Sequence, residues 1–261
     1  MCVMGLVFSG GLAAMMHGCF LLLAFFGEPV WIDVPVLRPM QSVKGSAALA
    51  DIESRMPAGH QYAFPSMPMT WGHETTHGLN SNLRMGRPNC NAIYCMDGLA
   101  AIVKEPRGRL SAVAARIPKS LRGPSFNLYL VQQRQYWEME PTYVLDEWVA
   151  YINGSLVGRE VRENGWHFEL LQAINFTVYS IAMAQSVCVS DPTYDHSQLR
   201  GVIDYNSQRV MKIWQELDAS GADDTHVRQI RAYLEAWRTG TEAAELRAFA
   251  KDYLGRSVLG E

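Results

Sequence analysis

The sequence predicts a mainly helical α+β fold, with a small β-sheet or hairpin and a helical C-terminal half. Three observations carry this prediction. The chain has 261 residues, of which 48% are hydrophobic and 19% charged, so it can bury a large core. Apolar residues recur at helical spacing through the second half, and short β-type runs cluster in the first. Disorder, collagen-like repetition and a coiled coil are excluded.

The first segment, residues 1–26, contains no charged residue, and its apolar length suits a signal-peptide core or a membrane span. No Lys or Arg precedes the apolar run, so both interpretations stay open. We expect residues 1–27 to be a signal peptide or a membrane anchor. The chain is therefore expected to be exported (secreted, periplasmic or at the cell envelope), with anchoring through residues 1–26 as the alternative to cleavage.

Residues 28–65 are rich in Pro and Gly and predict an extended lead-in with one short helix near 46–55. A helical pattern follows from 66, with Thr70 as the expected N-cap, and runs to 84. Two short runs, 91–95 and 99–103, are separated by a turn sequence and predict a β-hairpin.

Residues 126–131 predict a further strand and residues 136–152 a helix. The rest of the chain predicts four helices, at 166–189, 207–218, 224–239 and 242–254. The first of the four is apolar enough to span a membrane, but polar residues such as Glu169 and Gln172 recur along it, so we expect a core helix. We divide the chain into a core at 66–160 and a helical part at 161–261 that packs on it.

Charge and cysteine content limit the partners. Lys and Arg number 23 against 26 Asp and Glu, so there is no basic field to attract nucleic acid. Among 5 cysteines, Cys90 and Cys95 are close enough in sequence to form a small bridge in an exported protein, and two reduced thiols are the alternative. The sequence does not indicate an oligomeric state.

The strongest motif is H-E-x-x-H, formed by His73, Glu74 and His77. On a helix, positions i and i+4 share one face, so both imidazoles can bind one tetrahedral Zn²⁺ ion. Glu74 then lies beside the open coordination position, where a general base is needed.

A catalytic zinc site needs a third protein ligand. The metzincin arrangement places a His six residues after the second His, and Leu83 occupies that position. Glu147, on a predicted helix, is the preferred third ligand, because it shares the inward side with Tyr151 while Asp146 points about 100° away. The rival ligands are Asp146, Glu138, Glu140, Glu163 and His167.

With these residues the chain resembles the gluzincin class of zincin metallopeptidases, through His73, Glu74, His77 and an E-x-x-A-Y helix beginning at Glu147. The resemblance covers residues 70–153 and implies a zincin-like catalytic core at 66–160, with Zn²⁺ as cofactor and a peptide or protein as substrate. The implied mechanism is hydrolysis by zinc-activated water with Glu74 as general base.

Other residues are assigned supporting roles. Tyr143, Tyr151 and Tyr136 are near the third-ligand helix, and each is a candidate donor to the oxyanion. Asp146 and Asn80 are candidates for fixing the histidine tautomers from behind.

Trp71 and the hairpin at 91–103 are candidates for lining the cleft. In known zincins the edge strand precedes the metal helix, whereas the clear strands here follow it. Two other functions stay open. One is a non-catalytic helical binding or scaffold domain at the cell envelope, and the other is hydrolysis of a different amide, such as a cell-wall peptide bond.

Overall fold

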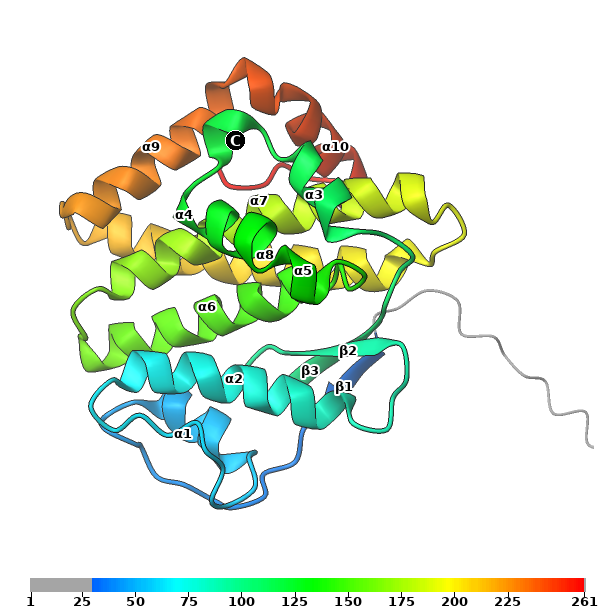
Figure 1. Ribbon diagram of the computed structural model, residues 1–261. Helices are drawn as coiled ribbons and strands as arrows, with labels where there is room; N and C mark the ends of the chain where they lie inside the picture. The colour runs from blue at the N-terminus through cyan, green and yellow to red at the C-terminus, as the bar shows by residue number, and fades with distance from the viewer. Residues whose placement is uncertain (1–29, 261) are drawn as a thin grey trace, which may run out of the picture.

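The computed structural model describes residues 30–260, and the predicted signal peptide or anchor at 1–27 lies outside the described residues. The fold is mainly helical with one small antiparallel sheet (Figure 1), which confirms the predicted α+β class. The strands are β1 (Val30–Asp33), β2 (Cys90–Tyr94) and β3 (Leu99–Lys104). The α-helices are α1 (Ala47–Ser54), α2 (Pro68–Arg84), α3 (Leu110–Arg116), α4 (Pro124–Asn127), α5 (Arg134–Trp137), α6 (Tyr143–Val161), α7 (Trp166–Ser190), α8 (His196–Ala219), α9 (Thr225–Thr239) and α10 (Ala244–Leu254). Single helical turns of other types are η1 (Lys119–Leu121), η2 (Leu128–Gln132) and η3 (Thr241–Ala243).

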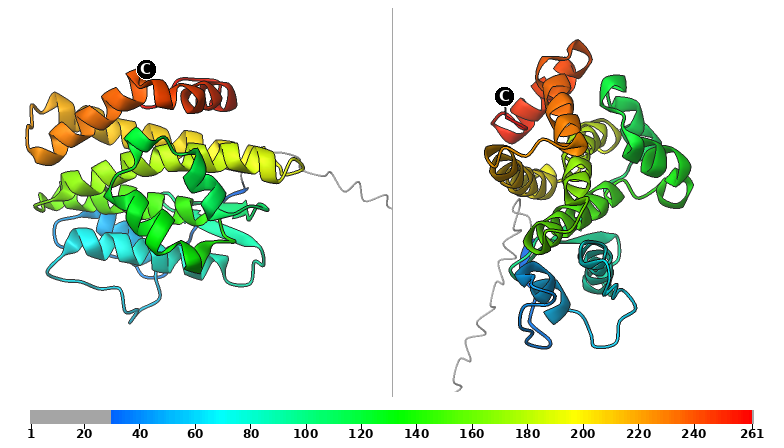
Figure 2. Two further views of the ribbon diagram at one scale, coloured as in Figure 1. Left: turned by 45° about the horizontal axis from the view of Figure 1, so that its top comes forward. Right: turned by 90° about the vertical axis from the view of Figure 1, so that its left-hand side faces the viewer.

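The helices stack in layers from α1 and α2 at one end, through α6 and α7, to α9 and α10 at the other end (Figures 1 and 2). The segment from α3 to α5 lies to one side of this stack. Helix α7 is the centre of the main hydrophobic core, because it packs against both α6 and α8. Of the described helices, α7 is the one long and apolar enough to cross a membrane, and 78% of its most apolar stretch is buried by the rest of the protein. That burial is typical of a core helix.

The sheet has the strand order β1-β3-β2 with antiparallel pairing throughout. The predicted hairpin is confirmed as β2 and β3, with Ala92 opposite Ile102. Its turn places Met96 (φ 74°), Asp97 (φ 54°) and Gly98 (φ 78°) in the left-handed region. The sequence analysis missed β1, because its four residues lie in a Pro-rich segment and pair only with the distant β3.

Three predicted elements are corrected by the structure. The strand at 126–131 is wrong, because this segment is helical in α4 and η2; Phe126, Tyr129 and Leu130 are buried at helical spacing. The helix at 136–152 begins only at Tyr143, after a turn at Pro141 whose ring nitrogen cannot donate a hydrogen bond. Helix α8 starts eleven residues before the predicted 207, because the Asp195 side chain accepts a hydrogen bond from Ser197 N and caps the helix.

The lead-in packs against the helix that carries the H-E-x-x-H motif. The predicted short helix is α1, and its Glu53 carboxylate accepts hydrogen bonds from the side chains of Trp71 (2.5 Å) and Thr75 (3.2 Å). The ring of Tyr62 lies over Gly78, where an added Cβ would come within 2.3 Å of the ring. Trp71 is therefore committed to the lead-in rather than free to line a cleft. These contacts fix α2 from the side that faces α1.

Candidate metal centre

Helix α2 carries the motif on the face that packs against α6. Pro68 is the first residue of this helix, two positions before the predicted Thr70 cap, where its missing N–H costs no hydrogen bond. Gly72 permits the close approach of α6, because an added Cβ would lie 2.7 Å from the side chain of Val157. The rings of His73 and His77 consequently lie between α2 and α6, with their centroids 5.0 Å apart.

Glu147 of α6 completes a triangle with the two histidines. His73 Nε2 and His77 Nε2 are 3.2 Å apart, and Glu147 Oε2 lies 4.0 Å from the first and 3.6 Å from the second. A circle through these three atoms has a radius of about 2.1 Å, which matches the usual zinc–nitrogen and zinc–oxygen distances. The three side chains are thus close enough to bind one metal ion, as the spacing predicted for His73, His77 and Glu147 requires.

The environment of Glu147 supports the fit to a cation. The side chain is 7% exposed, and its Oε1 accepts a hydrogen bond from the Tyr143 hydroxyl. Its Oε2, the atom that faces the histidines, is buried and has no hydrogen-bond partner among the described residues. A buried carboxylate oxygen without a partner is costly, and a divalent cation would compensate its charge.

His77 is held from behind by a carboxylate. Its Nδ1 lies 2.8 Å from Asp146 Oδ2, and Asn80 Nδ2 donates to Asp146 Oδ1 at 2.5 Å. Asn80 Oδ1 in turn accepts from the backbone N–H of Tyr94 in β2, at 2.8 Å. Asp146 therefore lies where the sequence analysis expected a partner of the histidines, whereas Asn80 supports Asp146 and does not contact a histidine itself.

His77 and Asp146 each favour the charged form of the other. Burial by itself lowers the pKa of His77, but the carboxylates of Asp146 and Glu147 outweigh burial and raise its pKa well above the usual value. Burial by itself raises the pKa of Asp146, and the His77 ring together with Asn80 turns the net shift of its pKa downward. Asp146 is thus an ionised acceptor that orients His77 Nδ1–H.

His73 has a carboxylate partner that the sequence analysis did not find. Glu169, on α7, places Oε2 3.1 Å from His73 Nδ1. Gly154 of α6 makes room for this contact, because an added Cβ would lie 2.9 Å from the same Glu169 oxygen and 3.2 Å from the His73 Cβ. The missed signal was an acidic residue inside an otherwise apolar helix, where an unpaired carboxylate is unfavourable.

Replacing Glu169 by Gln is expected to weaken zinc binding about 10- to 100-fold, because the imidazole loses its charged acceptor while the side-chain volume is kept. Zinc affinity is measured by competition with a chromophoric chelator, and unfolding is followed in metal-free protein. Glu163→Gln is the matched control, since Glu163 accepts from Met69 N of the same α2 helix at 2.8 Å and has no contact with either histidine. Equal affinities of the two variants would contradict the role given to Glu169.

The predicted oxyanion donors have other partners in this structure. The Tyr143 hydroxyl donates to Glu147, and the Tyr151 hydroxyl lies 2.7 Å from that of Tyr129. The Tyr151 ring also packs edge-on against His73, with centroids 4.6 Å apart. Tyr136 is 70% exposed. Tyr143 and Tyr151 therefore orient the cluster in this structure, and donation to an oxyanion by any of the three stays a prediction.

Glu74 is half-buried. No group in residues 30–260 hydrogen-bonds to its carboxylate. Burial is the main cause that raises the pKa of Tyr151, and the hydrogen bond with Tyr129 opposes it. The carboxylates of Glu147, Glu169 and Glu74 raise this pKa further, so Glu74 lies near the cluster. Its carboxylate is free to accept a proton, as the predicted general base requires.

Of the rival third ligands, Asp146 contacts His77 through Nδ1 rather than through the Nε2 that faces Glu147, and the other four form no hydrogen bond or ion pair with either histidine. Glu138 accepts from Ser111, Glu163 from Met69, and His167 contacts Asp224. Glu140 is exposed. Cys90, Cys95 and Cys188 are free thiols, so the open alternative of a Cys90–Cys95 bridge is not realised.

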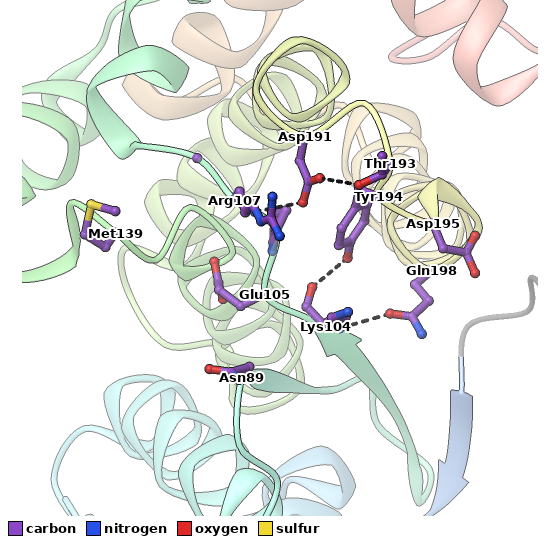
Figure 3. A pocket seen from close by; sticks show the side chains of 12 residues that line it. Asn89, Lys104, Glu105, Arg107, Met139, Asp191, Thr193, Tyr194, Asp195 and Gln198 are labelled. Atoms are coloured by element: carbon purple, nitrogen blue, oxygen red, sulfur yellow. Dashed lines mark hydrogen bonds between the residues drawn. The ribbon is translucent and has the colours of Figure 1, made fainter.

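A hollow of about 580 Å³ lies apart from the metal cluster, where the loop after α7 meets the end of β3 (Figure 3). The Tyr194 hydroxyl donates to the backbone oxygen of Lys104 at 2.6 Å, and Asp191 accepts from Arg107 N at 3.1 Å. Glu105 in this hollow accepts hydrogen bonds from the backbone and side chain of Thr142, which is the N-cap of α6. Glu105 thereby fixes the start of the helix that carries Glu147.

We expect Glu105 to make stability fall with rising pH. Burial raises the pKa of Glu105 from 4.5 to about 7, although the hydrogen bonds from Thr142 oppose this shift. Between these two pH values the folded protein therefore binds a proton that the unfolded chain has lost. The free energy of unfolding therefore decreases as pH rises through that window. In urea titrations of metal-free protein, Glu105→Gln should gain about 1 to 3 kcal/mol over wild type between pH 5 and pH 8. Glu140→Gln is the control, and parallel pH profiles for wild type and Glu105→Gln would refute the assignment.

Comparison with known protein families, with curated proteins and with solved structures finds no match to this chain. What the protein does must therefore be inferred from the cluster itself.

Proposed function

We propose that this protein is a zinc-dependent hydrolase, and specifically a metallopeptidase of the gluzincin type with a zincin-like core at residues 66–160. His73, His77 and Glu147 would be the zinc ligands and Glu74 the general base. The single observation that carries the proposal is the convergence of three ligand atoms within 4.8 Å of one another, one of them a buried oxygen without another partner, beside an unpaired Glu74.

The donor set favours zinc over harder cations. Two imidazole nitrogens and one carboxylate are the ligands of many catalytic zinc sites, whereas Ca²⁺ and Mg²⁺ prefer oxygen ligands alone. When bound, zinc polarises a carbonyl group and increases the acidity of water. In the proposed mechanism Glu74 accepts the proton of the attacking water and passes it to the leaving amine. Asp146 and Glu169 keep the two Nδ1–H groups turned outward, so that the Nε2 lone pairs of the histidines face the ion.

The proposed substrate is a peptide or protein, and nucleic acid is not proposed because the chain carries a net charge of −3. The charge-free run at 1–26 supports an exported protein that is secreted, periplasmic or held at the envelope by this segment.

Metal analysis combined with a cleavage screen tests the proposal. Purified wild type is expected to hold about one zinc ion per chain and to cleave members of a mixed peptide library, read by mass spectrometry. A variant with His73→Ala and His77→Ala should lose both properties. A wild type that takes up no zinc would overturn the proposal and favour the non-catalytic scaffold, and a zinc-loaded wild type that cleaves nothing would contradict the assignment as a peptidase.

A further inference from the structure

A second pocket, of about 240 Å³, lies between α6, α8 and the turn of the β2–β3 hairpin. Three basic side chains line it: Arg159 from α6, and Arg209 and Lys212 from α8. None of the lining residues belongs to the His73–His77–Glu147 cluster. We propose that this pocket binds a small oxyanion, the phosphate or carboxylate group of a small molecule, at the guanidinium of Arg209.

Arg209 is a half-buried cation held only by neutral groups. Its Nη1 donates to Asn206 Oδ1 and its Nη2 to Asn153 Oδ1, both at 2.8 Å. Within residues 30–260, no carboxylate lies within 4.0 Å of this guanidinium, whereas Arg159 in the same pocket forms an ion pair with Glu216. Burial lowers the pKa of Arg209, yet an arginine stays protonated in a protein, so its charge persists without a counterion.

The two amide contacts fix Arg209 and leave a donor available. Its Nε–H has no partner among residues 30–260, and the two Nη contacts prevent the group from turning away. Tyr205 adds a further restraint, with its ring centroid 6.0 Å from the guanidinium carbon. A guanidinium that is already oriented loses little entropy when it binds an oxyanion.

The local charge balance also favours an anion. Arg159 and Glu216 cancel each other, and exposed Lys212 has no ion pair with any described residue. Asp97 at the rim attracts Arg209 through space, but it is exposed and farther than the ion-pair limit. Arg209 and Lys212 against Asp97 leave a positive excess in a chain that is negative in total.

The pocket volume limits the size of the ligand. Sites for drug-sized ligands usually occupy about 300 to 1,000 Å³, and this pocket is smaller. A phosphate or carboxylate group on a small molecule fits, and its oxygens match the N–H donors that Arg209 and Lys212 present.

Calorimetric titration tests the site with inorganic phosphate and, separately, with succinate, in chloride buffer at constant ionic strength. At least one of these anions should bind wild type with a stoichiometry near unity. Arg209→Gln should lose about tenfold or more in affinity and Lys212→Gln about threefold, because a charge-assisted contact is stronger when buried. Lys251→Gln, an exposed lysine on α10, should bind as wild type does.

Two further measurements separate loss of anion binding from misfolding and from binding at the metal centre. Circular dichroism shows whether Arg209→Gln folds, and Lys212→Glu replaces it as the test variant if it does not. His77→Ala should retain binding of the anion, since the proposed metal centre is separate from the pocket. Binding of neither anion, equal binding by Lys212→Gln and Lys251→Gln, or loss of binding in His77→Ala would each overturn the proposal. Only the last outcome would assign the anion to the metal centre.

Discussion

Glu74→Gln is expected to retain zinc and to lose hydrolysis by about 10²- to 10⁴-fold, the usual contribution of a positioned general base. The amide has nearly the same volume as the carboxylate but cannot accept a proton at neutral pH. No described group hydrogen-bonds to the Glu74 carboxylate, so the substitution breaks no contact that supports the fold. Turnover is measured on whichever peptide the library screen identifies, with zinc content determined in the same samples.

A matched substitution separates loss of the base from loss of any carboxylate nearby. Glu140→Gln changes an exposed acidic residue in the turn before α6 that the structure keeps away from the histidines, and it should turn over substrate as wild type does. If Glu74→Gln keeps full activity with zinc bound, another group is the base and the assigned mechanism is wrong. If it loses zinc, Glu74 supports the metal rather than the proton transfer.

The sequence predicted the local parts of the fold well, because their determinants are local. The spacing of His73 and His77 on a helix and the hairpin turn at Met96–Gly98 depend on neighbouring residues, and both are present. The start of α6 at Tyr143 depends on Glu105, the residue that follows β3, which accepts hydrogen bonds from Thr142 at the N-cap of α6. No periodicity in the α6 segment contains that information.

In the candidate centre too, contacts set by neighbouring residues were predictable and contacts between distant elements were not. Glu147 was predictable because the E-x-x-A-Y helix shares one face, and Asp146 because it is adjacent in sequence. Glu169 was not, because its contact with His73 depends on how α7 crosses α6 at Gly154. Tyr129 was missed because it lies in a short apolar and aromatic run that favours a strand, yet the segment is helical and the Tyr129 hydroxyl lies 2.7 Å from that of Tyr151.

The substitution Glu147→Gln separates a metal ligand from a residue that supports the fold, because its effects on stability and on zinc binding should have opposite signs. In metal-free protein, at a pH above the raised pKa of His77 where both imidazoles are neutral, Glu147 Oε2 is a buried carboxylate oxygen without a hydrogen bond, so the neutral amide is expected to stabilise the fold by about 1 to 3 kcal/mol in urea unfolding. The Tyr143 hydroxyl can still donate to the amide oxygen, which keeps the side chain in place.

With zinc the order should reverse. Loss of a charged ligand is expected to weaken zinc binding by more than about 100-fold, beyond the range for a residue that only supports a ligand from behind. Because a ligand stabilises the native state in proportion to the logarithm of its concentration over Kd, zinc should raise the Tm of wild type and leave that of Glu147→Gln nearly unchanged. Glu160→Gln is the control on the same helix, since Glu160 accepts from Ser46 and Ala48 and should respond to zinc as wild type does. Two results together would contradict this role: a Glu147→Gln protein that is less stable than wild type without metal, and one that zinc stabilises as much as it stabilises wild type. Glu147 would then support the packing of α6, and the two histidines would bind zinc with a different third group.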